Sequence, residues 1–287
     1  MTPTLVRHQS RTASAPSAGT SERARDWAEI QERMLVPLIE AAYERLDVGP
    51  ATRLLGLGCG SGLALLIAAS RGAVVTGVDR PERAARLALA RDRLVPEPGW
   101  DGAPGMGASR VVTGGPADAA EPGRPPYNLI TAFEPVGCAA GDTEGLVAAL
   151  EGAVRLAEHG SAVVLVGWGP PERCATSGVL RVATRLTSRL SEAPRWRPSR
   201  RDDLEDVAAR AGLRPDGSGR VACPFGYADL DSAIRGLMST GAFDAAARAT
   251  DQAQVEKELT EALHGHVRRD GTVWMPNVFR YLIARTP

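Results

Sequence analysis

Short apolar segments alternate with segments of helical periodicity over the first half of the chain. Residues 52–57 and 73–78 are short and mainly apolar, as in strands that are buried on both faces. Apolar residues recur at helical spacing over 63–69 and again over 82–94. The order strand, helix, strand, helix is typical of a parallel β–α–β unit, whose crossover we expect to be right-handed.

The rest of the chain continues this alternation with longer helical segments. Strands are predicted over 110–113, 127–133, 161–168 and 278–284, with a further candidate at 220–223. Helices are predicted over 143–156, 176–190 and 201–211, and then in two segments that carry Leu230 to Met238 and Val255 to Leu263. We expect His159–Gly160 to end the first of these helices, and the Pro- and Gly-rich stretch 95–107 to form a loop.

The N-terminal part of the chain divides into a tail and a helix. Residues 1–21 are rich in Ser, Thr, Ala and Pro, so they bury too little surface to offset the entropy of ordering, and a disordered tail is expected. Ser21 is a candidate N-cap for the helix that follows, and Pro37 should kink that helix or divide it in two. Residues 22–287 are expected to form a single domain. Helical lid elements are expected at 22–46, 176–190 and 228–266.

Composition excludes several classes of protein. The chain has 287 residues, of which 44% are apolar, and its Lys and Arg residues equal its Asp and Glu residues in number. A balanced charge gives no overall field for nucleic acid or anionic lipid, so neither is expected as a partner. Four scattered cysteines favour a reducing compartment and no metal site. With no signal peptide and no long apolar span, a cytoplasmic location is expected.

One local cluster of positive charge stands out from this balance. Four arginines lie close together in the sequence: Arg195, Arg197, Arg200 and Arg201. They form either an anion site or a solvated loop, and the solvated loop is expected.

A glycine run supplies the candidate chemistry. Gly56 to Gly62 follows the first predicted strand and opens a helix, where bare backbone and unpaired N–H groups can hold a cofactor. Asp79 ends the next strand, 21 positions after Gly58. An acid that binds ribose hydroxyls is expected at about this spacing and at this place in the fold. The alternative for Asp79 is that it caps the helix starting near Pro81.

The spacing of the glycines separates the cofactor classes. The dinucleotide pattern G-x-G-x-x-G fails in either register, and the run has no Lys for a phosphate-binding loop. The run G-x-G-x-G with Asp79 after the next strand resembles the first motif of the class I S-adenosylmethionine (SAM)-dependent methyltransferases. The resemblance extends over about residues 27–284. It implies an α/β, Rossmann-like, seven-stranded, mostly parallel sheet with helices on both faces, an N-terminal helix and a helical insertion before the last strand.

The same resemblance implies a SAM site. The turn under the methionine part of the cofactor would be Gly58, Cys59, Gly60 and Gly62, with Asp79 on the ribose and Arg80 beside the adenine. Phe133, after the fourth strand, would face the cofactor, and Trp27 would cover it. Core packing is the alternative for both aromatic residues.

The sequence departs from the family at two positions. Gly56 stands where the family usually has Asp or Glu. The family also often has an acid just after the third strand, near the adenine, and here only Asp118, at a shifted position, can serve as that acid. Restoring Asp at position 56 is expected to tighten cofactor binding. The function expected is SAM-dependent methyl transfer to a small-molecule acceptor. The alternatives are a methyltransferase-like enzyme that catalyses a cyclisation or isomerisation, and a non-catalytic binding protein. No catalytic residue is assigned, although His264, His266 and Glu134 are candidates for a general base.

Overall fold

The computed structural model of the chain describes residues 18–94, 109–187 and 196–287. The predicted tail up to residue 17, the predicted loop at 95–107 and the end of the helix expected to reach residue 190 lie outside the described residues, as does Arg195.

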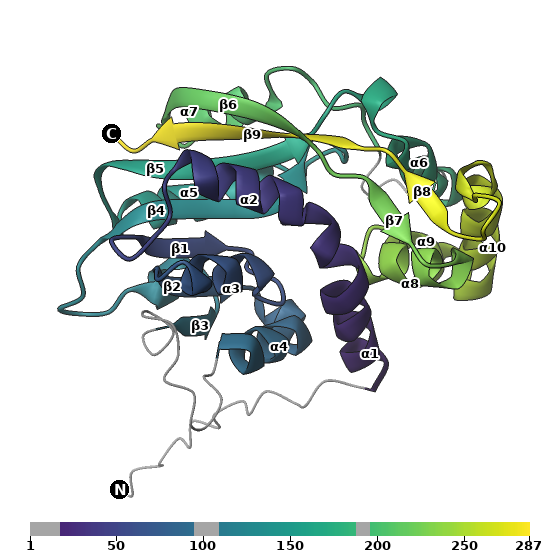
Figure 1. Cartoon of the computed structure of the whole chain (residues 1–287), viewed down its shortest axis with the longest axis horizontal. Helices are drawn as coiled ribbons and strands as arrows, with labels where there is room; N and C mark the ends of the chain where they lie inside the picture. The colour runs from purple at the N-terminus through teal and green to yellow at the C-terminus, as the bar shows by residue number, and fades with distance from the viewer. Residues whose placement is uncertain (1–17, 95–108, 188–195) are drawn as a thin grey trace, which may run out of the picture.

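A seven-stranded sheet forms the centre of the molecule, with the strand order β3-β2-β1-β4-β5-β9-β6 (Figure 1). Strand β9 runs antiparallel to both of its neighbours, and the other pairs are parallel. The prediction of a mostly parallel, Rossmann-like sheet is therefore confirmed. The strands are β1 Arg53–Leu57, β2 Val74–Asp79, β3 Arg110–Thr113, β4 Tyr127–Val136, β5 Ala157–Trp168, β6 Arg214–Ala222 and β9 Val278–Arg285.

Helices cover both faces because successive residues of a strand point to opposite faces. In β1, Leu54 packs in one apolar cluster and Leu55 in the other. One face carries α2 Val36–Arg45, α3 Leu63–Ser70 and α4 Ala84–Leu94, and the other carries α5 Glu144–Val154 and α7 Asp203–Arg210 (Figure 1). Short 3-10 helices lie at Pro81–Arg83, Pro116–Ala119, Pro171–Arg173 and His264–His266.

The N-terminal helical segment is interrupted, as Pro37 predicts. Helix α1 Ala18–Asp26 continues through a π turn, Trp27–Gln31, and a 3-10 turn, Glu32–Leu35, into α2. Pro37 lies in the first turn of α2, where no backbone N–H is needed. The prediction that Ser21 caps the helix is wrong, because Ser21 lies inside α1.

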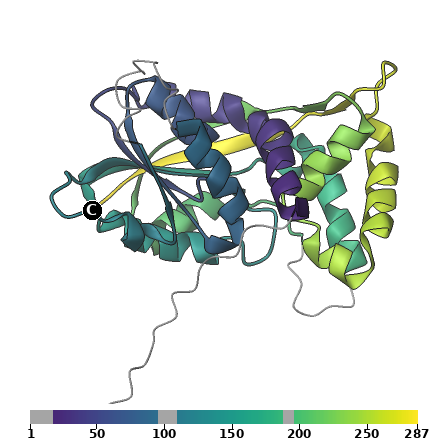
Figure 2. The same ribbon diagram turned by 90° about the horizontal axis from the view of Figure 1, so that it is seen from below.

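A group of helices lies beside the sheet, where the insertion is expected (Figures 1 and 2). It comprises α6 Thr176–Leu186, α8 Leu230–Ser239, α9 Asp244–Ala249 and α10 Gln252–Leu263, with a small sheet of β7 Phe225–Tyr227 and β8 Val273–Met275. Helix α1 packs against α8, and α6 packs against α10. None of the helices in the described ranges has the length and hydrophobicity that a bilayer span requires.

Leu65 of α3 fills a notch made by two facing glycines. Gly56 of β1 lies opposite Gly77 of β2 in the parallel register. A methyl group on Gly77 would lie 2.4 Å from Leu65 Cδ1, and one on Gly56 would lie 2.8 Å from Leu65 Cδ2. Leu65 is only 1% exposed and cannot move aside into solvent. The two glycines thus allow α3 to lie close to the sheet.

Replacing Gly77 with Ala should destabilise the protein. The new methyl group would meet Leu65 and also the Cβ of Cys59, at 2.9 Å. Overpacking of this kind costs about 1–3 kcal/mol. Chemical denaturation of the Gly77→Ala variant measures the change in the free energy of unfolding.

The matched control is Gly178→Ala in α6, where an added Cβ meets nothing within 4 Å. This change should leave stability unchanged or raise it by up to about 1 kcal/mol, since Ala favours helices. In a Leu65→Ala background, Gly77→Ala should cost less than in the wild type. Equal costs in the two backgrounds would contradict the notch.

Candidate functional site

The loop between β1 and α3 is a sharp turn built from glycines. Gly58, Gly60 and Gly62 have φ angles of 60°, 56° and 81°, in the region where other residues are strained. At Gly62, a Cβ would also lie 2.9 Å from Ala90 Cβ of α4. The backbone N–H of Cys59 donates to Val78 O at 3.1 Å, which ties the turn to the end of β2.

Asp79 is buried at the end of β2, beside this turn. Its Oδ2 accepts a hydrogen bond from Gly60 N at 3.0 Å, and its Oδ1 accepts one from Arg80 N at 2.8 Å. The 3-10 helix that begins at Pro81 has no side-chain cap, so Asp79 does not act as one. The carboxylate instead fixes the conformation of the glycine loop.

A cleft of about 580 Å³ opens beside Asp79 at the edge where the parallel strands end, which we term the carboxyl edge. This volume lies within the usual range for small-molecule sites. Asp79 and Arg80 line the cleft together with residues 114–116, at the end of β3, and residues that follow β4. Further lining residues are Leu57, Gly58, Glu134, Val136, Leu146 and Ala149.

A smaller cavity of about 40 Å³ lies under the N-terminal segment, next to Gly58 and Gly60. Trp27 and Phe133 line it. Trp27 Nε1 is buried there without a hydrogen-bond partner in the part of the chain that the structure describes. A Cβ on Gly60 would lie 3.3 Å from this nitrogen. The indole N–H is therefore an unused donor close to the glycine loop.

Glu32 connects the N-terminal segment to the loop. Its Oε1 accepts a hydrogen bond from Ser61 N at 3.2 Å, and its Oε2 accepts one from the Ser61 hydroxyl. Arg93 of α4 pairs with Glu32 at 2.7 Å and also donates to Ala28 O at 3.0 Å. This network was not predicted, because its members are far apart in sequence and no motif joins them.

Arg83 lies between two carboxylates of the carboxyl edge. It forms two hydrogen bonds with Glu134, of 2.8 and 2.6 Å, and its Nη1 lies 3.6 Å from Asp79 Oδ2. Desolvation alone would raise the pKa of Glu134. The hydrogen bonds and charge of Arg83, with the charges of Arg86 and Arg80, outweigh it and lower the pKa below its usual value. Burial also disfavours the charge of Arg83, but Glu134 and Asp79 raise its pKa further above the ordinary value.

Arg86 adds positive charge behind Trp27. Its guanidinium lies 4.0 Å from the centre of the indole ring and donates to Ser239 O at 2.6 Å. Burial, helped by the nearby charge of Arg83, lowers the pKa of Arg86 to about 10, so it is charged at neutral pH. The Trp27 ring is thus held between the cation of Arg86 and the glycine loop.

Most of the predicted site residues come together at this edge. Trp27, Gly58, Cys59, Gly60 and Phe133 line the smaller cavity, while Gly58, Asp79 and Arg80 line the cleft. Gly62 lines neither and packs against α4.

Two of these residues have structural contacts that bear on their roles. Burial, with the charges of Asp79 and Glu32, raises the pKa of Cys59 to about 12, so its thiol is not a nucleophile at neutral pH. Phe133 packs edge to face on Tyr43, with ring centres 5.5 Å apart, so it contacts the core as well as the cavity.

The candidate bases are not all at the site. Glu134 lines both cavities. His264 and His266 follow α10, in the group of helices beside the sheet, and line neither cavity. Asp118 is turned toward its own loop, where its Oδ2 accepts a hydrogen bond from Gly115 N at 2.9 Å.

Comparison with known proteins gives likenesses only at the level of structure. No protein-family model matches the sequence, and no curated protein matches it. One similar structure is magnesium protoporphyrin IX methyltransferase from Synechocystis, solved with bound S-adenosylhomocysteine (SAH). The likeness covers 94% of this chain and 95% of that protein, with 16% identity and a TM-score of 0.53.

Two bacillar proteins are similar in the same way. A protein from Bacillus halodurans, provisionally named a methyltransferase, covers 87% of this chain and 98% of its own, with 15% identity and a TM-score of 0.52. The YcgJ protein from Bacillus subtilis covers 86% and 97%, with 13% identity and a TM-score of 0.50. At these identities the likeness establishes the fold alone, and the chain has the fold of the class I SAM-dependent methyltransferases.

Proposed function

We propose that this protein binds SAM at the carboxyl edge and transfers its methyl group to a small-molecule acceptor. The observation that carries the proposal is the buried carboxylate of Asp79 at the wall of a cleft of about 580 Å³. The glycine loop holds that carboxylate in place through Gly60 N at 3.0 Å. An acid fixed beside a glycine turn suits a ligand with a ribose diol.

The residues around the cleft fit the parts of this cofactor. Each oxygen of Asp79 accepts one backbone hydrogen bond and keeps lone-pair capacity for a ribose hydroxyl. Arg80 and the stretch 114–116 would border the adenine. The unused Trp27 N–H would donate to the carboxylate of the methionine part, because a buried donor gains most from an acceptor that the ligand supplies.

Two carboxylates from other elements lie near the glycine loop, where the acid missing at position 56 would act. Asp at position 56 would place its Cβ 2.8 Å from Leu65 Cδ2, so the expected gain in affinity from Gly56→Asp would be opposed by a clash. Glu134 and Glu32 instead bring carboxylates to the loop from β4 and from the N-terminal segment. Glu134 Oε2 lies 3.5 Å from the place that a Cβ on Gly58 would take. Glu32 Oε1 lies 3.1 Å from the place of a Cβ on Gly60. Each acid is paired with an arginine, Glu134 with Arg83 and Glu32 with Arg93, so they would offer a cationic cofactor carboxylate oxygens whose charge is partly compensated.

The protein's share of the chemistry is alignment and exclusion of water. Bound SAM supplies an activated methyl group on a sulfonium, so a strong base is not required. The ring of Phe133 offers an aromatic face to a cation in the smaller cavity. Glu134 is held ionised by Arg83 and is therefore a weak base, so we assign it an electrostatic role and name no general base.

Asp79→Asn should weaken binding of both SAM and S-adenosylhomocysteine about tenfold to 100-fold, as expected for the loss of a hydrogen bond to a charged group. Titration calorimetry measures the affinities. The control is Asp92→Asn on the exposed face of α4, which should change neither affinity. If the wild type binds neither ligand, the proposal fails, and a non-methylating enzyme or a binding protein becomes the better hypothesis.

Trp27→Phe tests the unused donor. It should weaken binding of S-adenosylhomocysteine about two- to tenfold, the value of one neutral hydrogen bond. Binding of 5′-methylthioadenosine, which lacks the amino acid part, should not change. The thermal midpoint should stay close to that of the wild type, because Nε1 has no hydrogen-bond partner among the described residues. Equal weakening of both ligands would contradict the role given to the N–H group.

Glu134→Gln tests the electrostatic role. Removing the carboxylate leaves Asp79 as the one carboxylate paired with Arg83 among the described residues and makes the loop more positive, so the cationic SAM should lose several-fold more affinity than the neutral thioether product S-adenosylhomocysteine. Glu151→Gln, on the exposed side of α5, is the control and should leave the ratio of the two affinities unchanged. An unchanged ratio in Glu134→Gln would remove this residue from the site.

A further inference from the structure

A second groove lies at the other end of the carboxyl edge, where β5 ends, β9 begins and β6 ends. Its cavity volume is about 610 Å³. It shares no lining residue with the two cavities of the proposed cofactor site. Its walls come from the ends of the three strands and from the loop 199–201 before α7.

The groove has a strong excess of positive charge. One acid, Glu172, lines it, against five arginines: Arg173, Arg200, Arg201, Arg220 and Arg280. Since the whole chain is neutral, this concentration is local. A concave surface lined by one sign of charge attracts ligands of the opposite sign.

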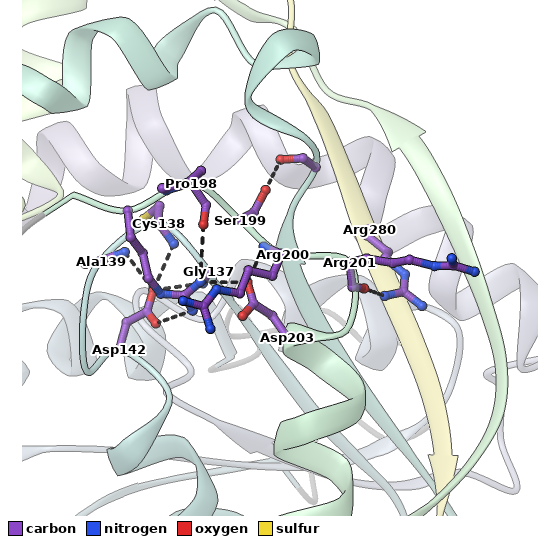
Figure 3. Close-up of polar contacts among 12 residues, drawn as sticks. Gly137, Cys138, Ala139, Asp142, Pro198, Ser199, Arg200, Arg201, Asp203 and Arg280 are labelled. Atoms are coloured by element: carbon purple, nitrogen blue, oxygen red, sulfur yellow. Dashed lines mark hydrogen bonds and ion pairs between the residues drawn. The ribbon is translucent and has the colours of Figure 1, made fainter.

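Three of the five guanidinium groups are free. Within the described residues, the side chains of Arg173, Arg200 and Arg220 make no hydrogen bond or ion pair, and all three residues are exposed. Arg280 is paired with Glu205 at 2.8 Å. It also donates to Arg201 O at 2.5 Å (Figure 3). The free groups therefore have their donors available to a ligand.

The loop that carries Arg200 is fixed rather than merely solvated. Asp203 Oδ2 accepts hydrogen bonds from Arg200 N at 2.7 Å and from Arg197 Nη1 at 2.9 Å, and the Ser199 hydroxyl donates to Gly169 O (Figure 3). Asp142 Oδ1 lies 3.5 Å from Arg197 Nη2. The prediction of a solvated loop thus does not hold for Arg197, which turns inward and pairs with two acids.

The groove also has an apolar wall. Trp168, Val221 and Val278 line it beside the arginines. Trp168 is held by Phe279, with ring centres 4.6 Å apart, so this wall is backed by packed aromatic residues. A site with an apolar wall and several free guanidinium groups suits a compact ligand that has an apolar body and an anionic end.

We propose that this groove binds the phosphate or diphosphate end of a small molecule. Guanidinium groups match oxyanions through paired N–H donors, and phosphate offers more acceptor oxygens and more charge than a carboxylate does. The proposal goes beyond the proposed function and is independent of it, because the groove residues and the cofactor residues are separate.

The test is calorimetric titration with inorganic pyrophosphate and phosphate at constant ionic strength. The wild type should bind one pyrophosphate per chain, and the double variant Arg200→Gln/Arg220→Gln should bind it at least about tenfold more weakly. The matched control is Arg155→Gln/Arg214→Gln, which removes the same charge from two exposed arginines away from the groove that have no ion pair with any described residue. Arg214 begins β6, about 20 Å from Arg220 along the strand.

The outcomes separate this proposal from the cofactor site. Absence of saturable binding, or an equal loss in the control, would overturn it. Asp79→Asn should keep its pyrophosphate affinity while the groove variant keeps its affinity for S-adenosylhomocysteine, so each site can fail alone. Phenyl phosphate should bind more tightly than phosphate, because its ring reaches the apolar wall, and equal affinities would overturn the role of Trp168.

Discussion

The contact of Leu65 with Gly56 and Gly77 sets the geometry on which the rest of the site depends. It seats α3 close to β1 and β2, so the connection from β1 to α3 must turn within a few residues. That turn uses left-handed backbone at three glycines and directs Gly60 N toward Asp79. The hydrophobic packing of Leu65, which also lines the smaller cavity, thereby positions the one carboxylate on which the proposed cofactor site rests.

Charge at the carboxyl edge is arranged around this frame. Asp79 and Glu134 would repel each other across the cleft if they stood alone, and Arg83 between them removes that cost. Asp79 is almost fully buried, with 2% of its side chain exposed, whereas 53% of the Glu134 side chain is exposed. Asp79 is therefore a fixed anion, whereas a ligand can reach Glu134 and change its ion pair with Arg83.

The sequence predicted the elements whose signal is local. Continuous apolar runs located the central strands, and the glycine spacing with Asp79 located the loop and the carboxylate that holds it. His159–Gly160 was wrongly expected to end a helix, because β5 begins at Ala157 with exposed residues that carry no strand pattern. Strands β7 and β8 have three residues each, too few for a periodicity to be detected.

The residues that the sequence did not reveal are those defined by pairing in space. Glu32, Arg83 and Arg93 are ordinary charged residues on helical segments, and their role follows only from the carboxylates and backbone groups that the fold brings to them. The same reasoning accounts for Gly56. An acidic residue at that position would place its Cβ 2.8 Å from Leu65 Cδ2, so it would disturb the packing of Leu65 in the notch. The carboxylates that do lie beside the glycine loop come from other elements, Glu134 from β4 and Glu32 from the N-terminal segment, and both line the smaller cavity. Their place at the loop follows from the fold and not from their position in the sequence.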